Sequence, residues 1–336
     1  MNGQVLQRES VPHATPSSAW GYVSGRVSVL ETMLLSRDFF GDVFRCNTLT
    51  EARSLLAKTM YRQKFPTDDS VRNYARILEF AGEEVIFTLF HDSPQHIMEP
   101  YFVFPKRYAS FRNLFLRASK REATISELEN IMDSLIIFSE DESSLVIHRE
   151  LLRSKDAPQH ADTVAQSLFL DSIACSMKLT YASLIPERSI ASLITTIALL
   201  DLWSCVVRSV WNGTSTDVVQ HWFIVPDTYR ELVKNSARLA ESTPGDAAVG
   251  FIPEKIAQKL RGFGFENLRK NIDDAILDVM HDDILVWRYI PYGPERVVTF
   301  IFALHSEQEN LKIALSSVVH GIDPDLVRQR LRRDYA

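Results

Sequence analysis

Apolar side chains recur at intervals of three and four residues near both ends of this chain. The pattern covers residues 20–35, 50–61 and 298–318, and in the first of these ranges the apolar positions are Val23, Val27, Leu30 and Leu34. This spacing places the side chains on one face of an α-helix, whereas a strand would alternate apolar and polar residues. Glycine and proline are also scarce, with 12 and 14 among 336 residues, which is few for an all-β protein or a phosphate-binding α/β protein. The sequence therefore predicts an all-α fold.

Several helix ends carry capping signals. Thr48 or Thr50 is available as the N-cap of the helix over residues 50–61, and Gly321 follows the helix over residues 298–318 as a C-cap. Asp323 followed by Pro324 predicts the start of one more helix. Four arginines lie in the last turns of that helix, where the helix dipole favours positive charge, and they are expected to form a solvated face: Arg328, Arg330, Arg332 and Arg333.

A weak internal repeat indicates how the chain is divided. Three segments begin with a polar residue, have a small amide or hydroxyl side chain three positions later, and continue as an apolar helical run. The paired positions are Ser110 and Asn113, Asp201 and Ser204, and Glu307 and Asn310. The copies lie about 100 residues apart, which is too far for a solenoid repeat. We therefore expect a flexible tail over residues 1–18 and three similar helical domains over 19–130, 131–245 and 246–336.

Charge and cysteine content limit the choice of partner and compartment. A formal net charge of −6 gives no overall attraction to nucleic acid or to an anionic membrane. The three cysteines are far apart and form no CxxC pair, so a reducing compartment is expected, with neither disulfides nor zinc. Residues 1–18 lack the apolar run of a signal peptide. Residues 190–207 are mostly apolar, but Asp201 interrupts them, which favours a buried helix over a membrane span.

No local motif supports catalysis or a cofactor. The patterns GxxxxGK[ST], GxSxG, HExxH and CxxC are absent. His281, Asp282 and Asp283 are adjacent and would point to different faces of a helix, and His91 and His96 lack a carboxylate in ligand register. We predict no catalytic, cofactor or metal site. A helical hydrolase built from scattered Asp, Glu and His residues remains the enzyme alternative.

Residues 261–268 are similar to the RNA-recognition fingerprint, in which aromatic side chains on a strand stack on bases. Glu266 and Leu268 stand where that fingerprint has a valine and an aromatic residue, and the segment continues into a helical pattern. A loop before a helix is the favoured interpretation. An RNA-binding helical protein that uses Arg261 to Leu268 is kept as an alternative.

Three segments of the chain resemble one protein family. Residues 22–26 read Tyr-Val-Ser-Gly-Arg, residues 59–61 read Thr-Met-Tyr, and residues 292–335 contain an aromatic apolar helix, Glu307-x-x-Asn310, a glycine turn and an arginine-rich end. In this order and spacing they resemble the C-type stalk protein of bacterial and archaeal V/A-type rotary ATPases, which is similar to the d-type protein of the eukaryotic vacuolar enzyme. The sequence departs from the family at Ser110, where the repeated motif is usually acidic, and at Ser204, where it usually has an amide.

The resemblance implies three similar helical domains around a pseudo-threefold axis, shaped like a funnel. It implies a non-catalytic central-stalk subunit, located in the cytoplasm, that joins the membrane c ring to the axle subunits of D and F type without a cofactor. Contact with the membrane is expected only through the ring, and contact with nucleic acid is not expected. The candidate interface or structural residues are Tyr22, Arg26, Asn113, Asp201, Ser204, Glu307 and Asn310. For the polar residues of the repeat we favour structural hydrogen bonds over direct partner contact.

Overall fold

A computed structural model describes residues 16–62, 74–94, 99–135, 144–154, 158–240, 254–262, 265–328 and 331. Every regular element in these ranges is a helix, which confirms the predicted all-α fold. Most of the tail expected over residues 1–18 lies outside the described residues, as do His96, Arg330, Arg332 and Arg333. The chain divides into two compact units.

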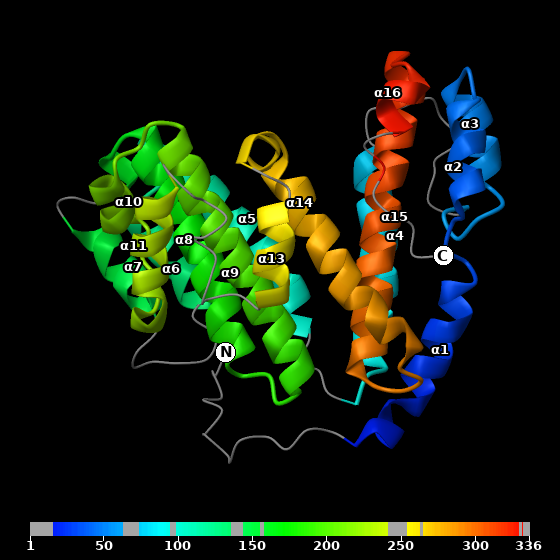
Figure 1. Ribbon diagram of the computed structural model, residues 1–336, viewed down its shortest axis with the longest axis horizontal. Coiled ribbons are helices and arrows are strands. Elements are labelled where there is room, and N and C mark those ends of the chain that lie inside the picture. The colour runs from blue at the N-terminus through cyan, green and yellow to red at the C-terminus, as the bar shows by residue number, and fades with distance from the viewer. Residues whose placement is uncertain are drawn as a thin grey trace. The chain divides into compact units, whose positions relative to one another are not determined.

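Unit 1 contains the middle of the chain, Ile97–Met280. Its helices are α5 (Glu99–Ser119), α6 (Ile125–Leu135), α7 (Ser144–Arg153), η4 (Pro158–His160), α8 (Thr163–Ala182), α9 (Arg188–Trp211), α10 (Thr216–Trp222), η5 (Asp227–Tyr229), α11 (Arg230–Leu239), α13 (Glu254–Gly262) and most of α14 (Phe265–Leu285). The helices α8 and α9 form a hairpin (Figure 1), and α5, α10 and α11 pack around it. Large side chains such as Trp203 and Phe169 fill its core.

The apolar segment predicted over residues 190–207 lies within α9. Among the described residues, α9 is the one helix long and apolar enough to cross a membrane, although 67% of its most apolar 18-residue window is buried inside the protein. The core helix of a globular domain has these same properties. Asp201 in its middle forms an ion pair with Lys178 of α8, so its charge is compensated within the unit.

Unit 2 combines the two ends of the chain, Thr15–His96 and His281–Ala336. Its helices are η1 (Ser17–Trp20), α1 (Gly21–Glu31), α2 (Arg37–Phe44), α3 (Leu49–Leu56), α4 (Tyr74–His91), the last residues of α14, η6 (Val286–Tyr289), α15 (Pro294–His320) and α16 (Pro324–Arg328). The 27-residue α15 is the centre of the unit, because α1, α2, α3, α4, η6 and α16 all contact it (Figure 1). Phe40, Leu78 and Leu311 lie in the core around it.

The predicted caps are present, whereas two helix lengths differ from expectation. Thr48 accepts the N-cap hydrogen bond of α3, and Gly321 ends α15 in the left-handed conformation. The helix predicted over residues 20–35 ends at Glu31. The amides of Met33 and Leu34 then bond to carbonyls three positions earlier, and the Leu35 amide donates to the carboxylate of Glu307. The helix predicted over residues 50–61 ends at Leu56, and a turn follows it in which Thr59 donates to the Leu56 carbonyl.

The division into two units differs from three consecutive domains, because the expected first and third domains both contribute to unit 2. The order of the helices along the chain gives no sign that helices from the two ends share one core. The pseudo-threefold funnel arrangement is not shown by these contacts and stays a prediction.

Candidate functional site

The three copies of the sequence repeat share a local structure. Ser110, Asp201 and Glu307 lie at or just past the midpoint of the long helices α5, α9 and α15. A residue with positive φ follows each of these helices within two positions: Arg121 (61°), Gly213 (89°) and Gly321 (61°). The polar positions and the glycine at 321 were visible in the sequence, but the shared turn was not, because its first copy has no glycine.

The same hydrogen bond closes each of these turns. The amide after the left-handed residue donates to the carbonyl five positions earlier, as in a Schellman motif. The three bonds are Glu122 N to Arg117 O (2.8 Å), Thr214 N to Ser209 O (3.0 Å) and Ile322 N to Ser317 O (3.0 Å). A new helix then starts at a polar side chain that accepts from the backbone: Thr124, Ser215 or Asp323. The repeat is therefore a long helix, a left-handed turn and a capped helix, present three times.

In the third copy, Glu307 is buried and connects three segments of unit 2. The hydroxyl of Tyr61 donates to its Oε1 at 2.7 Å, and the amide of Leu35 donates to its Oε2. Burial raises the pKa of Glu307 to about 7, against the lowering effect of these two hydrogen bonds. Burial and the neighbouring carboxylate also raise the pKa of Tyr61. We call Glu307, Leu35 and Tyr61 the Glu307 bridge.

The Glu307 bridge joins two segments that carry the family resemblance. Tyr61 ends the Thr-x-Tyr segment, and Glu307 starts the Glu-x-x-Asn segment. Ser24, in the Tyr22 to Arg26 segment, accepts a hydrogen bond from the amide of Gly293 at 3.4 Å. Asn310 is also buried, and the amide of Gln308 donates to the carbonyl of Leu78 in α4. Glu307 and Gln308 therefore connect α15 to Leu35, Tyr61 and α4 within unit 2.

In the second copy, Asp201 is half-buried and paired with Lys178. Ser204 is buried and donates to the carbonyl of Asp201 at 3.0 Å. Arg208, one turn further on, binds Asp273 of α14 at 2.7 Å. Burial raises the pKa of the neighbouring Cys205 thiol to about 12, so this thiol stays protonated at neutral pH and is a poor nucleophile.

In the first copy, both Ser110 and Asn113 are exposed on α5. The structure therefore does not place the polar residues of the three copies in equivalent surroundings. The third copy is buried, the second is partly buried, and the first faces solvent.

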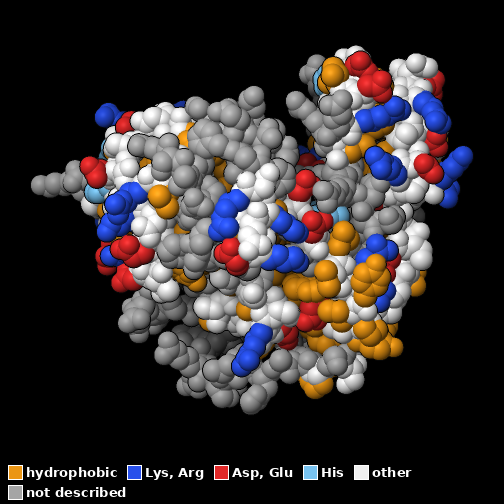
Figure 2. Space-filling model, in the orientation of Figure 1, with side chains coloured by type: hydrophobic (Ala, Val, Ile, Leu, Met, Phe, Trp, Pro, Cys, Tyr) orange, Lys and Arg blue, Asp and Glu red, His pale blue; other side chains and the backbone are white. Residues whose placement is uncertain are grey.

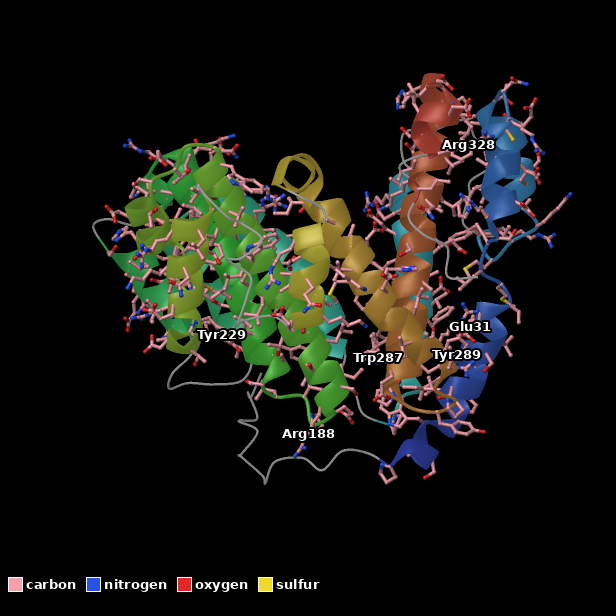
Figure 3. The ribbon with its side chains drawn as sticks, viewed as in Figure 1. Glu31, Arg188, Tyr229, Trp287, Tyr289 and Arg328 are labelled. Atoms are coloured by element: carbon pink, nitrogen blue, oxygen red, sulfur yellow. The ribbon has the colours of Figure 1, made fainter. Side chains whose placement is uncertain are left out.

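Tyr22 and Arg26 lie on α1 with different surroundings. Arg26 forms an ion pair with Asp92, whereas Tyr22 is 72% exposed. Tyr22 belongs to a group of exposed apolar residues on α1, in the turn after α1, on η6 and in the loop after η6, which we call the α1–η6 surface: Tyr22, Val29, Met33, Val286, Tyr289 and Tyr292. Hydrophobic side chains gather over these elements in Figure 2, and Figure 3 shows Tyr289 beside α1.

Backbone and ionic contacts hold the two sides of the α1–η6 surface together. The hydrogen bond from Gly293 to Ser24 joins the loop after η6 to α1. Arg296 in the first turn of α15 pairs with Glu31 at the end of α1, at 2.7 Å. The sequence pointed to Tyr22 alone, because the other aromatic residues of the surface are more than 260 positions away in the chain.

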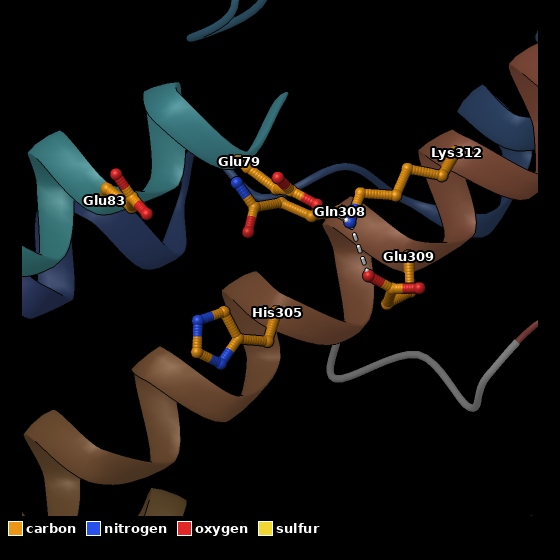
Figure 4. A pocket seen from close by; sticks show the side chains of 6 residues that line it. All are labelled: Glu79, Glu83, His305, Gln308, Glu309 and Lys312. Carbon is orange, nitrogen blue, oxygen red and sulfur yellow. Dashed lines mark hydrogen bonds and ion pairs between the residues drawn. The ribbon is translucent and has the colours of Figure 1, made fainter. Parts of the chain in front are cut away.

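A pocket of about 360 Å³ lies between α4 and α15 in unit 2 (Figure 4). It is lined by Glu79, Glu83, His305, Gln308, Glu309 and Lys312. Lys312 binds Glu79 and Glu309, both at 2.8 Å, so its charge is already neutralised within the protein. No group of His, Cys, Asp and Glu among the described residues has an arrangement suited to a metal ion.

The best-placed Ser and His pair does not have the geometry of a hydrolase. His148 and Ser172 are fully buried in unit 1, with Nε2 and Oγ 2.7 Å apart. The Ser172 hydroxyl donates to the carbonyl of Phe169 at 2.8 Å. Its one proton is therefore used, so the imidazole must act as the donor toward Ser172 and does not accept its proton.

The segment similar to the RNA fingerprint is helical in its described part. Arg261 and Gly262 end α13, and Phe265 begins α14. Residues 263 and 264 lie outside the described residues, as do the side chains of residues 265–268. The fingerprint places its aromatic residues on a strand, whereas the described part of this segment is helical. His281, expected at a solvated helix end, is instead half-buried within α14.

A scan against models of known protein families finds no match, and a search of curated proteins finds no similar sequence. The family resemblance therefore rests on the residues quoted above.

Proposed function

We propose that this chain is a non-catalytic central-stalk subunit of a V/A-type rotary ATPase, joining the membrane c ring to the D-type and F-type axle subunits in the cytoplasm. The observation that carries the proposal is the meeting of Tyr61 and Glu307 at 2.7 Å. Two segments that each resemble the C-type stalk family are 246 positions apart and form one buried contact. A chance likeness between short segments gives no reason for them to meet.

The threefold helix–turn–helix element supports the same proposal. The resemblance implies three similar helical domains around a pseudo-threefold axis, and the described residues contain three copies of one local structure closed by the same hydrogen bond. We propose that the three domains, over 19–130, 131–245 and 246–336, form a funnel that receives the axle at its wide end.

We further propose that the α1–η6 surface is part of the base that contacts the ring. Aromatic residues and methionine are enriched in the centres of protein interfaces, and Lys, Glu and Asp are depleted there. Two charged residues that border this surface are paired within the unit, Arg26 with Asp92 and Glu31 with Arg296. The exposed cation Arg288 on η6 lies over the ring of Tyr289, so the surface carries a single positive charge among its apolar side chains. The surface therefore offers little attraction to an anionic lipid surface and fits an uncharged protein surface better.

Binding of the purified ring to the tagged chain tests this assignment. Replacing Tyr22 and Tyr289 by Ser should weaken ring binding about tenfold or more, because exposed tyrosines are common hot spots of interfaces. Leu326→Ser on α16 is the matched control, since Leu326 is 64% exposed but lies outside the surface. Unchanged ring binding by the double variant would contradict the assignment. Loss of axle binding with ring binding retained would place this surface against the axle instead.

A further inference from the structure

We propose that the Glu307 bridge is a proton-sensitive fastener, which holds residues 21–62, from α1 through the turn after α3, firmly on α15 when Glu307 is neutral and loosens that segment when Glu307 ionises. The geometry supports this in three ways. The carboxyl group is buried, its two oxygens accept from Leu35 and Tyr61, and both donors belong to that segment.

The carboxylate of Glu307 has no compensating positive charge in the described part of unit 2. Tyr61 is the titratable group in contact with it. On the helices packed against α15, several charged groups are paired elsewhere: Glu31 with Arg296, Asp42 with Arg45, Glu79 with Lys312, and Asp325 with Arg328. Burial and the hydrogen bonds from Leu35 and Tyr61 account for the pKa of Glu307, and the charged groups of α2, α3 and the turn after α3 (Arg37, Asp38, Glu51 and Lys58) have no part in its shift. On α15 itself, His305, Glu309 and Lys312 line the pocket toward α4, together with Glu83 (Figure 4). Hydrogen bonds are therefore the only contacts that stabilise an ionised Glu307 in the described part of unit 2. Burying a charge in this way lowers the stability of the folded unit.

Both protonation states satisfy the hydrogen-bonding groups. The ionised form accepts from the Leu35 amide and the Tyr61 hydroxyl. In the neutral form one oxygen still accepts from Leu35, and the new O–H donates to the phenol oxygen of Tyr61, which can accept as well as donate. The two states therefore differ mainly in whether a charge is buried. Opening the segment exposes the charged carboxylate to water, which stabilises it.

The sign of the effect follows from the pKa. Burial raises the pKa of Glu307 from 4.5 to about 7, so the folded unit binds the proton more tightly than an opened one. The stabilisation is full below pH 4.5 and is lost as the pH rises through 7. With these two values, the opening equilibrium of the segment increases about tenfold between pH 6 and pH 8.

Loosening of this segment would affect the proposed function, because the segment carries part of the α1–η6 surface. Tyr22 and Val29 lie on α1, and Met33 lies two residues past its end. If the ring assignment holds, contact with the ring weakens as the pH rises above 7. The experiment below uses the isolated full chain, so its outcome does not depend on that assignment.

Hydrogen exchange measured by mass spectrometry tests the proposal, with Glu307→Gln as the permanently neutral variant. Its amide imitates the neutral acid, accepting from Leu35 and donating to Tyr61. Dividing the wild-type exchange rate by the Glu307→Gln rate at each pH removes the intrinsic pH dependence of exchange. For peptides that cover residues 32–36 and 57–62, this ratio should rise about tenfold from pH 6 to pH 8, whereas peptides from α8 and α9 should show no change. A ratio that stays flat would overturn the proposal.

Two further variants separate the fastener from general destabilisation. Glu309→Gln changes a partly exposed carboxylate on the same helix, paired with Lys312, and should reproduce the pH dependence of the wild type. Tyr61→Phe removes a hydrogen bond to the charged form, which raises the pKa of Glu307 further, so the transition should move to higher pH. A midpoint that stays in place or moves lower would contradict the role of Glu307, even if Glu307→Gln fails to fold.

Discussion

Glu307, Gln308 and Asn310 are buried polar residues on a helix whose other buried positions are mostly apolar. Each such side chain must find partners inside the protein, because an unsatisfied buried polar group costs about 1–3 kcal/mol. Glu307 binds Leu35 and Tyr61, and Gln308 binds the carbonyl of Leu78. The polar residues of α15 therefore set which segments lie against it, in addition to the apolar packing of the core.

Position 82 on α4 needs a glycine, because the side chain of Gln308 occupies the space that a Cβ would take. A Cβ built at Gly82 would overlap the amide group of Gln308, which is buried and hydrogen-bonded to Leu78. Gly82→Ala should displace that amide and lower the free energy of unfolding by about 1–3 kcal/mol, the cost of a lost buried hydrogen bond.

Gly41→Ala is the control, since Gly41 lies on helix α2 and its added Cβ would meet nothing within 4 Å. This change should raise stability by about 0.5–1 kcal/mol, through the better helix propensity of alanine. Urea unfolding measures both variants. Equal effects of the two substitutions would show that the contact with Gln308 is unimportant.

At the scale of elements, the long helices α5, α9 and α15 end in the same closed turn, but only two of the three turns have the residue that suits it. A left-handed conformation costs an ordinary residue roughly 1–2 kcal/mol, and glycine avoids this cost. Gly213 and Gly321 follow the rule, whereas Arg121 adopts a φ of 61°. The exposed Arg121 is therefore held in a strained conformation by the turn around it.

Arg121→Gly should raise the free energy of unfolding by about 1 kcal/mol, because it removes this strain. Lys120→Gly, one position earlier and without a positive φ, should have no effect or should destabilise the protein. Denaturant titration of both variants gives the comparison. A destabilising Arg121→Gly substitution would contradict the equivalence of the three turns.

The sequence predicted the elements better than their ends. Helical spacing and the caps at Thr48, Gly321 and Asp323 were found in the structure, because these signals act between residues close in the chain. The predicted ends of α1 and α3 were wrong by several residues. Past each helix the chain contacts Glu307 through Leu35 or Tyr61, which lie 272 and 246 positions away from it, and such distant contacts leave no local pattern. The turn at Arg121 gave no signal, because its left-handed conformation comes from the surrounding turn and not from the residue type.

At the scale of the whole molecule, the sequence pattern did not predict the division into two units. An internal repeat indicates related segments, but it does not say which segments share a core. The pairing of residues 15–96 with 281–336 depends on long-range contacts such as Tyr61 to Glu307 and Gly293 to Ser24. Of the candidate residues, Glu307, Asn310 and Ser204 are buried, whereas Tyr22 is an exposed apolar residue.

The proposed role makes the chain a mechanical connection and assigns ATP hydrolysis to other subunits. No phosphate-binding motif occurs in the sequence, and the hydroxyl of Ser172, beside His148, donates to a backbone carbonyl. An adaptor between axle and ring is required for ion movement and dispensable for hydrolysis by the catalytic head.

The most direct test is a paired measurement of ATP hydrolysis and ion pumping by the reconstituted rotary complex, with and without this chain. If the chain is the proposed adaptor, the catalytic head continues to hydrolyse ATP when the chain is omitted, while ion movement falls to background and returns when the chain is added back. Full ion pumping in the absence of the chain, or complete loss of ATP hydrolysis by the isolated head, would refute the adaptor role.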